Sequence, residues 1–179
     1  LLHLHTMPPL FAAALFNPRS LTARALLVAT GVTEAGDFNR DDVRDLEMPS
    51  VNGTGNARSV AKLYGTAATG APELGLSRTV REALEGPAVP PTGSTRDKIM
   101  RLYASFSLGF GKPTSKFVFG STERAFGWPG LGGSFGFADP DTGVGFVMNK
   151  LGYHAYSDPR ELALRQALFR DVLGARTQR

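Results

Sequence analysis

Two serine patterns in the chain match arrangements used in nucleophilic catalysis. Residues 132–136 read Gly-Gly-Ser-Phe-Gly, the pattern of a nucleophile elbow, and Asp139, Asp141 and His154 follow Ser134 in the order of a catalytic triad. An elbow requires a strand, a sharp turn and then a helix, whereas alternating phenylalanines and a turn follow Ser134. The carboxylates also come too soon after the serine for the chain to wrap into a triad. We therefore interpret Asp139 as a turn residue.

Residues 59–62 read Ser-Val-Ala-Lys, which matches the Ser-x-x-Lys pattern of a lysine-activated serine. On a helix, Ser59 would lie roughly 160–180° from the centre of the apolar stripe, with Lys62 beside it on the polar face. A solvated lysine stays protonated and cannot act as a base at neutral pH. A catalytic pair would therefore need a second domain covering this face.

Metal and cofactor chemistry has little support in the sequence. The chain has no cysteine, and its three histidines, His3, His5 and His154, are too scattered to form a convincing site. His3 and His5 could share one face of a strand, but no third ligand is indicated. We expect surface or loop histidines, no metal and no cofactor.

Residues 126–140 contain most of the functional signal, because they place five glycines among aromatic residues and end in a turn. Glycine in a strand marks a bulge or a close approach to the backbone, so this stretch predicts the wall of a cleft beside Trp128. Pro129 has no N–H to donate, which predicts an edge strand or a bulge. Free backbone N–H groups on such an edge could bind a ligand carbonyl, and Trp128 could equally be an ordinary core residue.

Helices are predicted on both sides of this stretch. Apolar residues at a 3.6-residue period predict a helix over residues 57–68, ended by Gly70 and Pro72. Shorter helices are predicted over residues 20–30 and 77–84, with loops over residues 31–53 and 86–95. The last helix follows Asp158, Pro159 and Glu161, which form a helix-start signal. Its predicted apolar arc comprises Leu162, Leu164, Leu168, Phe169, Val172 and Leu173.

From residue 106 the apolar period changes from 3.6 to 2. Alternation predicts strand structure over residues 106–110, around Trp128, over residues 135–137 and over residues 144–148. Residues 139–143, Asp-Pro-Asp-Thr-Gly, predict the turn between the last two strands. We therefore expect the middle of the C-terminal half to form an antiparallel meander, and we expect the amphipathic helix directly after it to lie on the sheet.

Composition limits the classes of function. The 179 residues are 42% hydrophobic and 20% charged, which is typical of one globular domain with a real core. The net charge is +4 and the pI about 9.7, but the arginines are spread along the chain. This favours solvated faces over nucleic-acid binding, which is supported only by the pI. No apolar stretch reaches membrane-spanning length, so no membrane partner is expected. The compartment stays open, with the cytoplasm slightly preferred.

Two segments resemble the serine β-lactamase-like hydrolases, in particular class C-type β-lactamases and family VIII carboxylesterases. Residues 48–64 resemble that family's Pro-x-x-Asn-Gly motif leading into a helix, and residues 126–150 resemble its last sheet segment. Trp128-Pro129-Gly130 matches the Trp-x-Gly form of the family's third motif. The resemblance covers about residues 48–173, whereas residues 1–47 match only loosely.

The resemblance implies an α+β fold with an antiparallel sheet flanked by helices, including a C-terminal helix packed on the sheet. It divides the chain into a loosely matched helical and loop segment, 1–47, and the C-terminal part of a β-lactamase-like domain, 48–179. It also implies that the backbone N–H of Leu131 is an oxyanion-hole donor and that Trp128, Gly130 and Gly132 contact substrate. Gly133 would likewise leave room for the substrate.

The chain also departs from the family pattern. The family's Ser-x-x-Lys nucleophile motif and Tyr-x-Asn motif lie upstream of the matched part, and the chain has no Tyr-x-Asn. The resemblance therefore implies the C-terminal half of an acyl-enzyme hydrolase, whose N-terminal half comes from the same precursor or from another chain.

The third motif bears on the substrate, because Trp128 and Pro129 offer neither the cation nor the hydroxyl of a Lys-Thr-Gly motif. A small neutral ester with apolar groups is the expected substrate. The alternatives are a β-lactamase or penicillin-binding-type peptidase, and a non-catalytic binding module that has lost the nucleophile.

Overall fold

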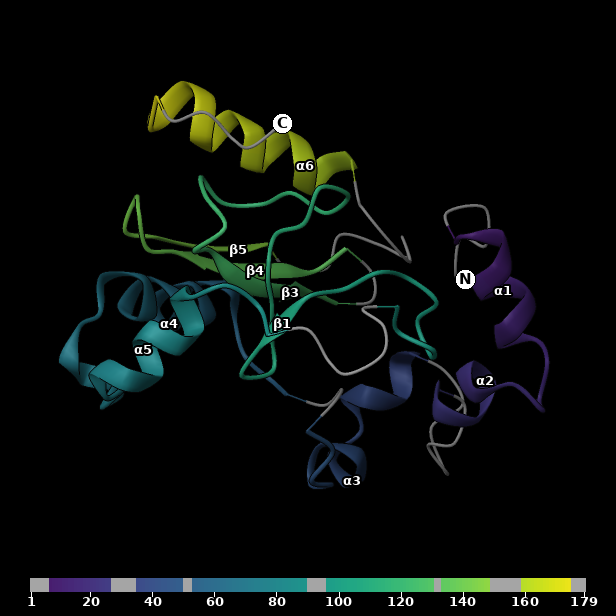
Figure 1. The fold of residues 1–179 in the computed structure, drawn as a ribbon. Coiled ribbons are helices and arrows are strands. Elements are labelled where there is room, and N and C mark those ends of the chain that lie inside the picture. The colour runs from purple at the N-terminus through teal and green to yellow at the C-terminus, as the bar shows by residue number, and fades with distance from the viewer. Residues whose placement is uncertain are drawn as a thin grey trace.

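A computed structural model describes residues 7–26, 35–49, 53–89, 96–130, 133–148 and 159–174. A single antiparallel sheet formed by these residues lies between helices (Figure 1). Helix α6 covers one face, and helices α4 and α5 lie on the opposite side. The predicted antiparallel sheet with flanking helices and a C-terminal helix on the sheet is confirmed.

The sheet follows the chain order β1-β2-β3-β4-β5, so each strand pairs antiparallel with the next one along the sequence. The strands are β1 (Phe106–Ser107), β2 (Phe110–Gly111), β3 (Phe126–Pro129), β4 (Phe135–Asp139) and β5 (Val144–Met148). The last three strands are long enough for an inward and outward alternation, and the turn over residues 139–143 joins β4 to β5 as predicted. The predicted meander is therefore confirmed for this part of the chain.

The first two strands differ from the expectation of continuous strand structure over residues 106–110. Leu108 and Gly109 have φ values of 47° and 84°, and Ser107 pairs directly with Phe110 across them. Two successive positive φ values form the tight hairpin turn that suits the strand twist. The alternating pattern predicts one strand because a leucine does not indicate the left-handed backbone conformation that Leu108 adopts.

Helix α4 (Ala57–Thr69) confirms the predicted helix and its ends. Asn56 accepts a hydrogen bond from the Ser59 N–H, and Gly70 ends the helix in the left-handed conformation at φ 64°. The short η3 (Pro72–Leu74) follows, and Ser77 caps α5 (Arg78–Glu85) by accepting from the Val80 N–H. Asparagine and serine are preferred residue types at the start of a helix, so the sequence and the structure agree for these two helices.

Helix α4 lies unusually close to the last strand, and glycines make this approach possible. A Cβ on Gly145 would lie 2.1 Å from the Gly65 nitrogen and 2.4 Å from the Ala61 carbonyl oxygen. A Cβ on Gly136 would lie 2.6 Å from the Tyr64 ring. Glycines 136 and 145 therefore serve helix–sheet packing rather than a cleft.

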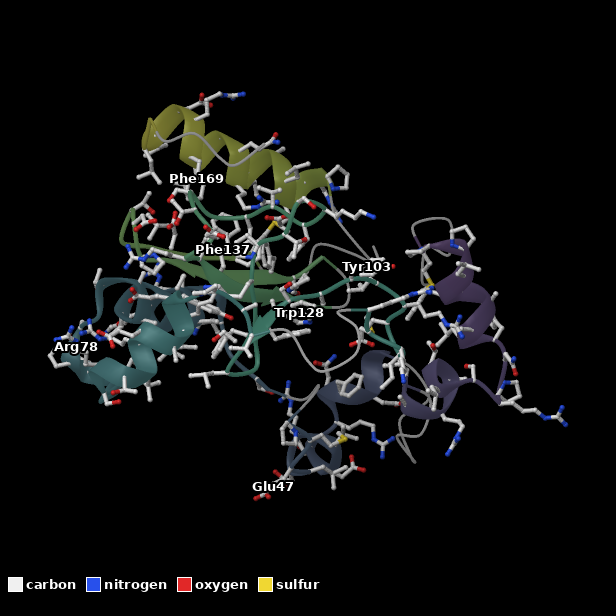
Figure 2. The ribbon with its side chains drawn as sticks, viewed as in Figure 1. Glu47, Arg78, Tyr103, Trp128, Phe137 and Phe169 are labelled. Carbon is white, nitrogen blue, oxygen red and sulfur yellow. The ribbon has the colours of Figure 1, made fainter. Side chains whose placement is uncertain are left out.

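Helix α6 (Pro159–Ala167) continues as the wider turn η4 (Leu168–Val172) on the other face. The core beneath it contains Phe119, Phe135, Phe137 and Phe169, and the Phe137 and Phe169 rings stack with centroids 6.1 Å apart (Figure 2). Aromatic pairs at this spacing add to the stabilisation from burial.

The predicted apolar arc of this helix is only partly correct. Leu162, Leu164 and Val172 are exposed, whereas Glu161 and Arg165 are buried. Arg165 Nε donates to Glu161 Oε1 at 2.6 Å, and Arg165 Nη1 donates to the Val118 carbonyl at 2.7 Å. A paired and hydrogen-bonded arginine can occupy an inward position that the hydrophobic pattern assigns to an apolar residue. The proposed cap Asp158 lies outside the described residues.

The N-terminal helices lie beside the sheet rather than on its faces (Figure 1). They are α1 (Pro9–Leu15), α2 (Leu21–Leu26), η2 (Ala35–Asn39) and α3 (Asp41–Arg44). Thr22 ties α2 to the middle of the chain by donating to the Ile99 carbonyl at 2.6 Å. The loop predicted over residues 31–53 was wrong where η2 and α3 form, because its polar and acidic residues also suit helix starts. Within the described ranges, no helix is both long and apolar enough to span a membrane.

Candidate active site

The Trp-Pro-Gly segment lies at the end of an interior strand. β3 pairs with β2 through Gly111 and Gly127, and with β4 along its length, so the prediction that Pro129 marks an edge strand is wrong. The proline fits because β2 is only two residues long and its pairing with β3 ends before Pro129. The Gly130 N–H donates to the Ser134 carbonyl at 2.7 Å on the β4 side. By alternation, the Pro129 nitrogen faces the other side, where no ladder bond is lost.

The Trp128 ring is held in place by other aromatic residues and by one glycine. Its centroid lies 4.7 Å from that of Phe106 and 6.4 Å from that of Phe117. A Cβ on Gly111 would lie 2.3 Å from Trp128 Cε3, so the indole rests directly on the β2 backbone. Trp128 itself is half-buried (Figure 2). We call Phe106, Phe117 and Trp128 the aromatic wall.

Part of this wall is open to solvent. Phe106 is 38% exposed, and Tyr103 and Leu108, close to it in sequence, are 56% and 60% exposed. The wall is therefore neither sealed in the core nor a fully solvated surface. It is an apolar surface that a small organic group could contact.

The backbone after the tryptophan is only partly described. Gly130 is exposed, and a Cβ there would meet nothing closer than the Ser134 Cβ at 3.7 Å. Gly133 has a φ of 83°, so glycine suits the turn into β4. Leu131 and Gly132 lie outside the described residues, so the oxyanion role of the Leu131 N–H and the substrate contact of Gly132 stay predictions.

The residues of the triad-like pattern do not come together in the described part of the chain. Ser134 precedes β4 and Asp139 ends it, so the strand separates them by roughly 16 Å at about 3.3 Å per residue. The Asp139 carboxylate is completely buried and accepts from the Ser121 N–H at 2.9 Å, the Ser121 hydroxyl at 3.0 Å and the Thr142 hydroxyl at 2.9 Å. Asp139 holds the turn together, as predicted, and His154 lies outside the described residues.

The Ser-x-x-Lys pattern lies at the start of α4, where both of its functional side chains are exposed. The Ser59 hydroxyl lies 3.1 Å from Asn56 Oδ1, which also accepts from the Ser59 N–H at 2.9 Å. Ser59 therefore belongs to the helix cap. Nothing in the described structure desolvates Lys62.

The described ranges contain no group of three His, Cys, Asp or Glu side chains that could hold a metal ion. His3 and His5 fall outside those ranges. The arrangement offers apolar contact and backbone groups rather than metal ligands.

Sequence reasoning missed two parts of this region. Phe117 completes the aromatic wall, although its only sequence signal is an alternation with Phe119. Lys112 is also missed, because it lies between Gly111 and Pro113 and nothing there indicates a buried lysine. It is nevertheless only 3% exposed, and burial lowers its pKa to about 8.

The fold and the Trp-Pro-Gly segment define a protein of the β-lactamase type, and the comparisons identify the family. The β-lactamase family model matches residues 8–169, and the chain belongs to this family of serine hydrolases. The chain is 35% identical over 105 residues to the protein named esterase/beta-lactamase LipL from Mycobacterium tuberculosis. The matched region covers 58% of this chain and 23% of that protein.

Two solved structures support the same assignment. A penicillin-binding protein homologue from Caulobacter crescentus superposes with a TM-score of 0.61 at 30% identity, covering 78% of this chain and 37% of that one. A family VIII carboxylesterase superposes with a TM-score of 0.54 at 30% identity, covering 65% of this chain and 31% of that one. The chain therefore spans well under half the length of these relatives, and the family resemblance inferred from the sequence is confirmed.

Proposed function

We propose that this chain supplies one wall of the active site of a carboxylesterase that forms an acyl-enzyme and cleaves neutral esters with apolar acyl or alkyl groups. The observation that carries the proposal is the half-buried Trp128 in an aromatic wall, followed directly by Pro129 and the exposed Gly130. Burying an apolar substrate group of this kind contributes about 25 cal/mol per Å².

The proposed chemistry combines this wall with the backbone that follows it. The Leu131 N–H would donate to the oxyanion of the tetrahedral intermediate, a contribution of roughly 3 kcal/mol to transition-state stability. The serine nucleophile and its lysine and tyrosine partners would come from the N-terminal half of the same hydrolase. Gly130 would leave space for the substrate, since no described atom lies closer than 3.7 Å to a Cβ there.

A second candidate function is that of a β-lactamase or penicillin-binding-type peptidase. Similarity to the Caulobacter penicillin-binding protein homologue favours it. Lys116, next to Phe117 in sequence, also holds its ammonium 5.5 Å from the centre of the exposed Tyr103 ring. This cation could attract a substrate carboxylate, which Trp128 and Pro129 cannot do.

Substrate preference of the native full-length protein distinguishes these candidates. We expect faster hydrolysis of a short p-nitrophenyl ester than of a cephalosporin, and we expect Trp128→Ala to lower kcat/KM for the ester by about 10–100-fold, equivalent to a lost apolar contact of about 1.5–3 kcal/mol. Trp128→Phe should recover most of this loss. The control Phe16→Ala removes an aromatic side chain that is 67% exposed at the end of α1 and should leave the rate unchanged.

Faster turnover of the cephalosporin would favour the second candidate. A native protein whose intact mass corresponds to a start near Leu1, and which hydrolyses neither substrate, would instead indicate a non-catalytic module.

A further inference from the structure

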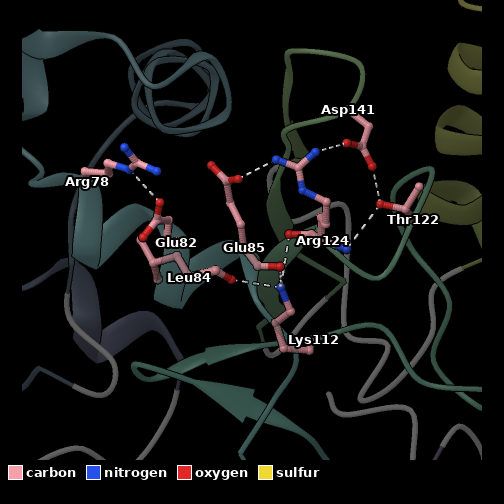
Figure 3. Close-up of polar contacts among 8 residues, drawn as sticks. All are labelled: Arg78, Glu82, Leu84, Glu85, Lys112, Thr122, Arg124 and Asp141. Carbon is pink, nitrogen blue, oxygen red and sulfur yellow. Dashed lines mark hydrogen bonds and ion pairs between the residues drawn. The ribbon is translucent and has the colours of Figure 1, made fainter.

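The C-terminal end of α5 contacts the β1–β2 hairpin through hydrogen bonds. The last carbonyls of a helix have no partner within the helix, and here side chains of the hairpin supply donors. The Ser107 hydroxyl donates to the Ala83 carbonyl. Lys112 Nζ donates to the carbonyls of Leu84 at 2.8 Å and Glu85 at 3.2 Å (Figure 3). An ammonium is also favourable at this end of the helix dipole.

The same ammonium reaches the segment that leads into β3. Lys112 Nζ donates to the Arg124 carbonyl at 3.0 Å (Figure 3). It also lies 5.8 Å from the centre of the Phe126 ring. An ammonium has three N–H donors, so three carbonyls from two segments use all of them. Lys112 thus joins the end of α5, the end of β2 and the start of β3.

This joint lies next to the contact that holds Trp128. Gly111 immediately precedes Lys112, pairs with Gly127 of β3 and carries the indole on its backbone, where a Cβ would come within 2.3 Å of Trp128 Cε3. The pairing of β2 with β3 is short, because these strands are two and four residues long. A side chain that fixes β2 against the start of β3 therefore also fixes the surface on which the indole rests.

We propose that Lys112 is a positioning residue for the aromatic wall, and that its three hydrogen bonds to the carbonyls of Leu84, Glu85 and Arg124 set the place of Trp128. Its importance for catalysis rests on the proposed esterase function. The positional effect itself does not, and a measurement without substrate can test it.

The protonation of Lys112 is part of this arrangement. Burial lowers the pKa of Lys112 to about 8. The negative charges of Glu85 and Glu123 oppose this shift, and the positive charge of Arg124 adds to it. Beside the ammonium, Arg124 Nη2 pairs with Glu85 Oε2 at 2.5 Å. The Arg124 guanidinium also pairs with the Asp141 carboxylate (Figure 3). A neutral amine keeps two N–H donors, so loss of the proton leaves one of the three carbonyls without its donor.

The test uses Trp128 as its own reporter, because it is the only tryptophan in the chain. Emission spectra and acrylamide quenching are measured for the unchanged protein, for Lys112→Met and for the matched control Lys98→Met, whose lysine is exposed. Circular dichroism confirms that each variant is folded at the temperature used. We expect a shifted emission maximum and stronger quenching in Lys112→Met, and the unchanged spectrum in Lys98→Met.

A pH titration gives a second readout on the unchanged protein. We expect the Trp128 emission to change with a midpoint near pH 8, and we expect Lys112→Arg, which stays charged, to lack this transition. A Lys112→Met spectrum identical to that of the unchanged protein, with only a lower Tm, would overturn the proposal. If Lys112→Met does not fold, the titration decides, and emission that stays constant through pH 8 overturns the proposal.

Failure of this inference and failure of the proposed function give different results. If the emission depends on Lys112 but Trp128→Ala leaves ester hydrolysis by the native full-length protein unchanged, the esterase proposal fails and the positioning role stands. If hydrolysis depends on Trp128 while the emission ignores Lys112, only the positioning role fails. Where both hold, Lys112→Met should raise KM for the ester more than it lowers kcat.

Discussion

At the scale of single residues, Asp139 illustrates why a sequence pattern needs its surroundings. It stands where a triad carboxylate would follow a serine, yet its two oxygens accept three hydrogen bonds from Ser121 and Thr142 in a fully buried site. A carboxylate occupied in this way organises the β4–β5 turn.

This role makes a clear prediction for Asp139→Ala. Removal of the carboxylate leaves buried donors without an acceptor, and we expect the free energy of unfolding to fall by about 3 kcal/mol. Urea denaturation measures this change. The control Asp45→Ala alters an exposed aspartate and should stay within about 0.5 kcal/mol of the unchanged protein. An unchanged midpoint for Asp139→Ala would contradict the structural role.

At the scale of elements, the contact between α4 and β5 depends on Gly145, because a Cβ there would lie 2.1 Å from the Gly65 nitrogen, whereas a Cβ on Gly65 would meet nothing closer than 3.8 Å. Gly145 lets the strand backbone approach the helix backbone, which sets the separation of these two layers. The neighbouring Tyr64 ring fills the space that Gly136 leaves on β4. One helix is thereby fitted to two strands by the absence of side chains.

We expect Gly145→Ala to destabilise the protein by about 1–3 kcal/mol or more, because the new methyl group must push α4 away from the sheet. Gly53→Ala is the matched control, since a Cβ there would meet nothing within 4 Å. Thermal unfolding of the two variants measures the difference. Equal Tm values would show that the helix can move at no cost.

At the scale of the whole molecule, one buried lysine gives global stability a dependence on alkaline pH. The pKa of Lys112 is about 8 in the folded protein and near its ordinary value of 10.5 in the unfolded chain. Between these values unfolding takes up a proton, so the free energy of unfolding contributed by this group rises with pH. The stabilisation contributed by Lys112 is present in full above pH 10.5 and is lost as the pH falls through 8.

The expected rise is at most about 3.5 kcal/mol, at about 1.4 kcal/mol per pKa unit. Denaturation at a series of pH values, compared between the unchanged protein and Lys112→Met, isolates this contribution. A pH profile that is the same for both proteins would contradict the lowered pKa.

The layered arrangement was predictable from the sequence where local signals agree. For α4, the apolar period, Gly70 and Pro72 all indicate the same helix, and for β4 and β5 the alternation and the intervening turn do likewise. The family was also accessible, because the Trp-Pro-Gly segment and the residues around it carry its motifs.

Features that depend on partners distant in sequence were not predictable. The place of Pro129 inside the sheet depends on how short β2 is, and the inward direction of Arg165 depends on the Val118 carbonyl, 47 residues away in the chain. The same holds for Lys112, whose three acceptors come from other segments. Local periodicity contains no information about such contacts.

The β1–β2 turn has an energetic cost that depends on the residue at position 108. Leu108 adopts a left-handed backbone that costs an ordinary side chain roughly 1 kcal/mol, and its leucine side chain stays largely in water. Asparagine or glycine would form the same turn at lower cost. The turn alone therefore does not account for a leucine at this position, where it presents an exposed apolar side chain two residues from Phe106 of the aromatic wall.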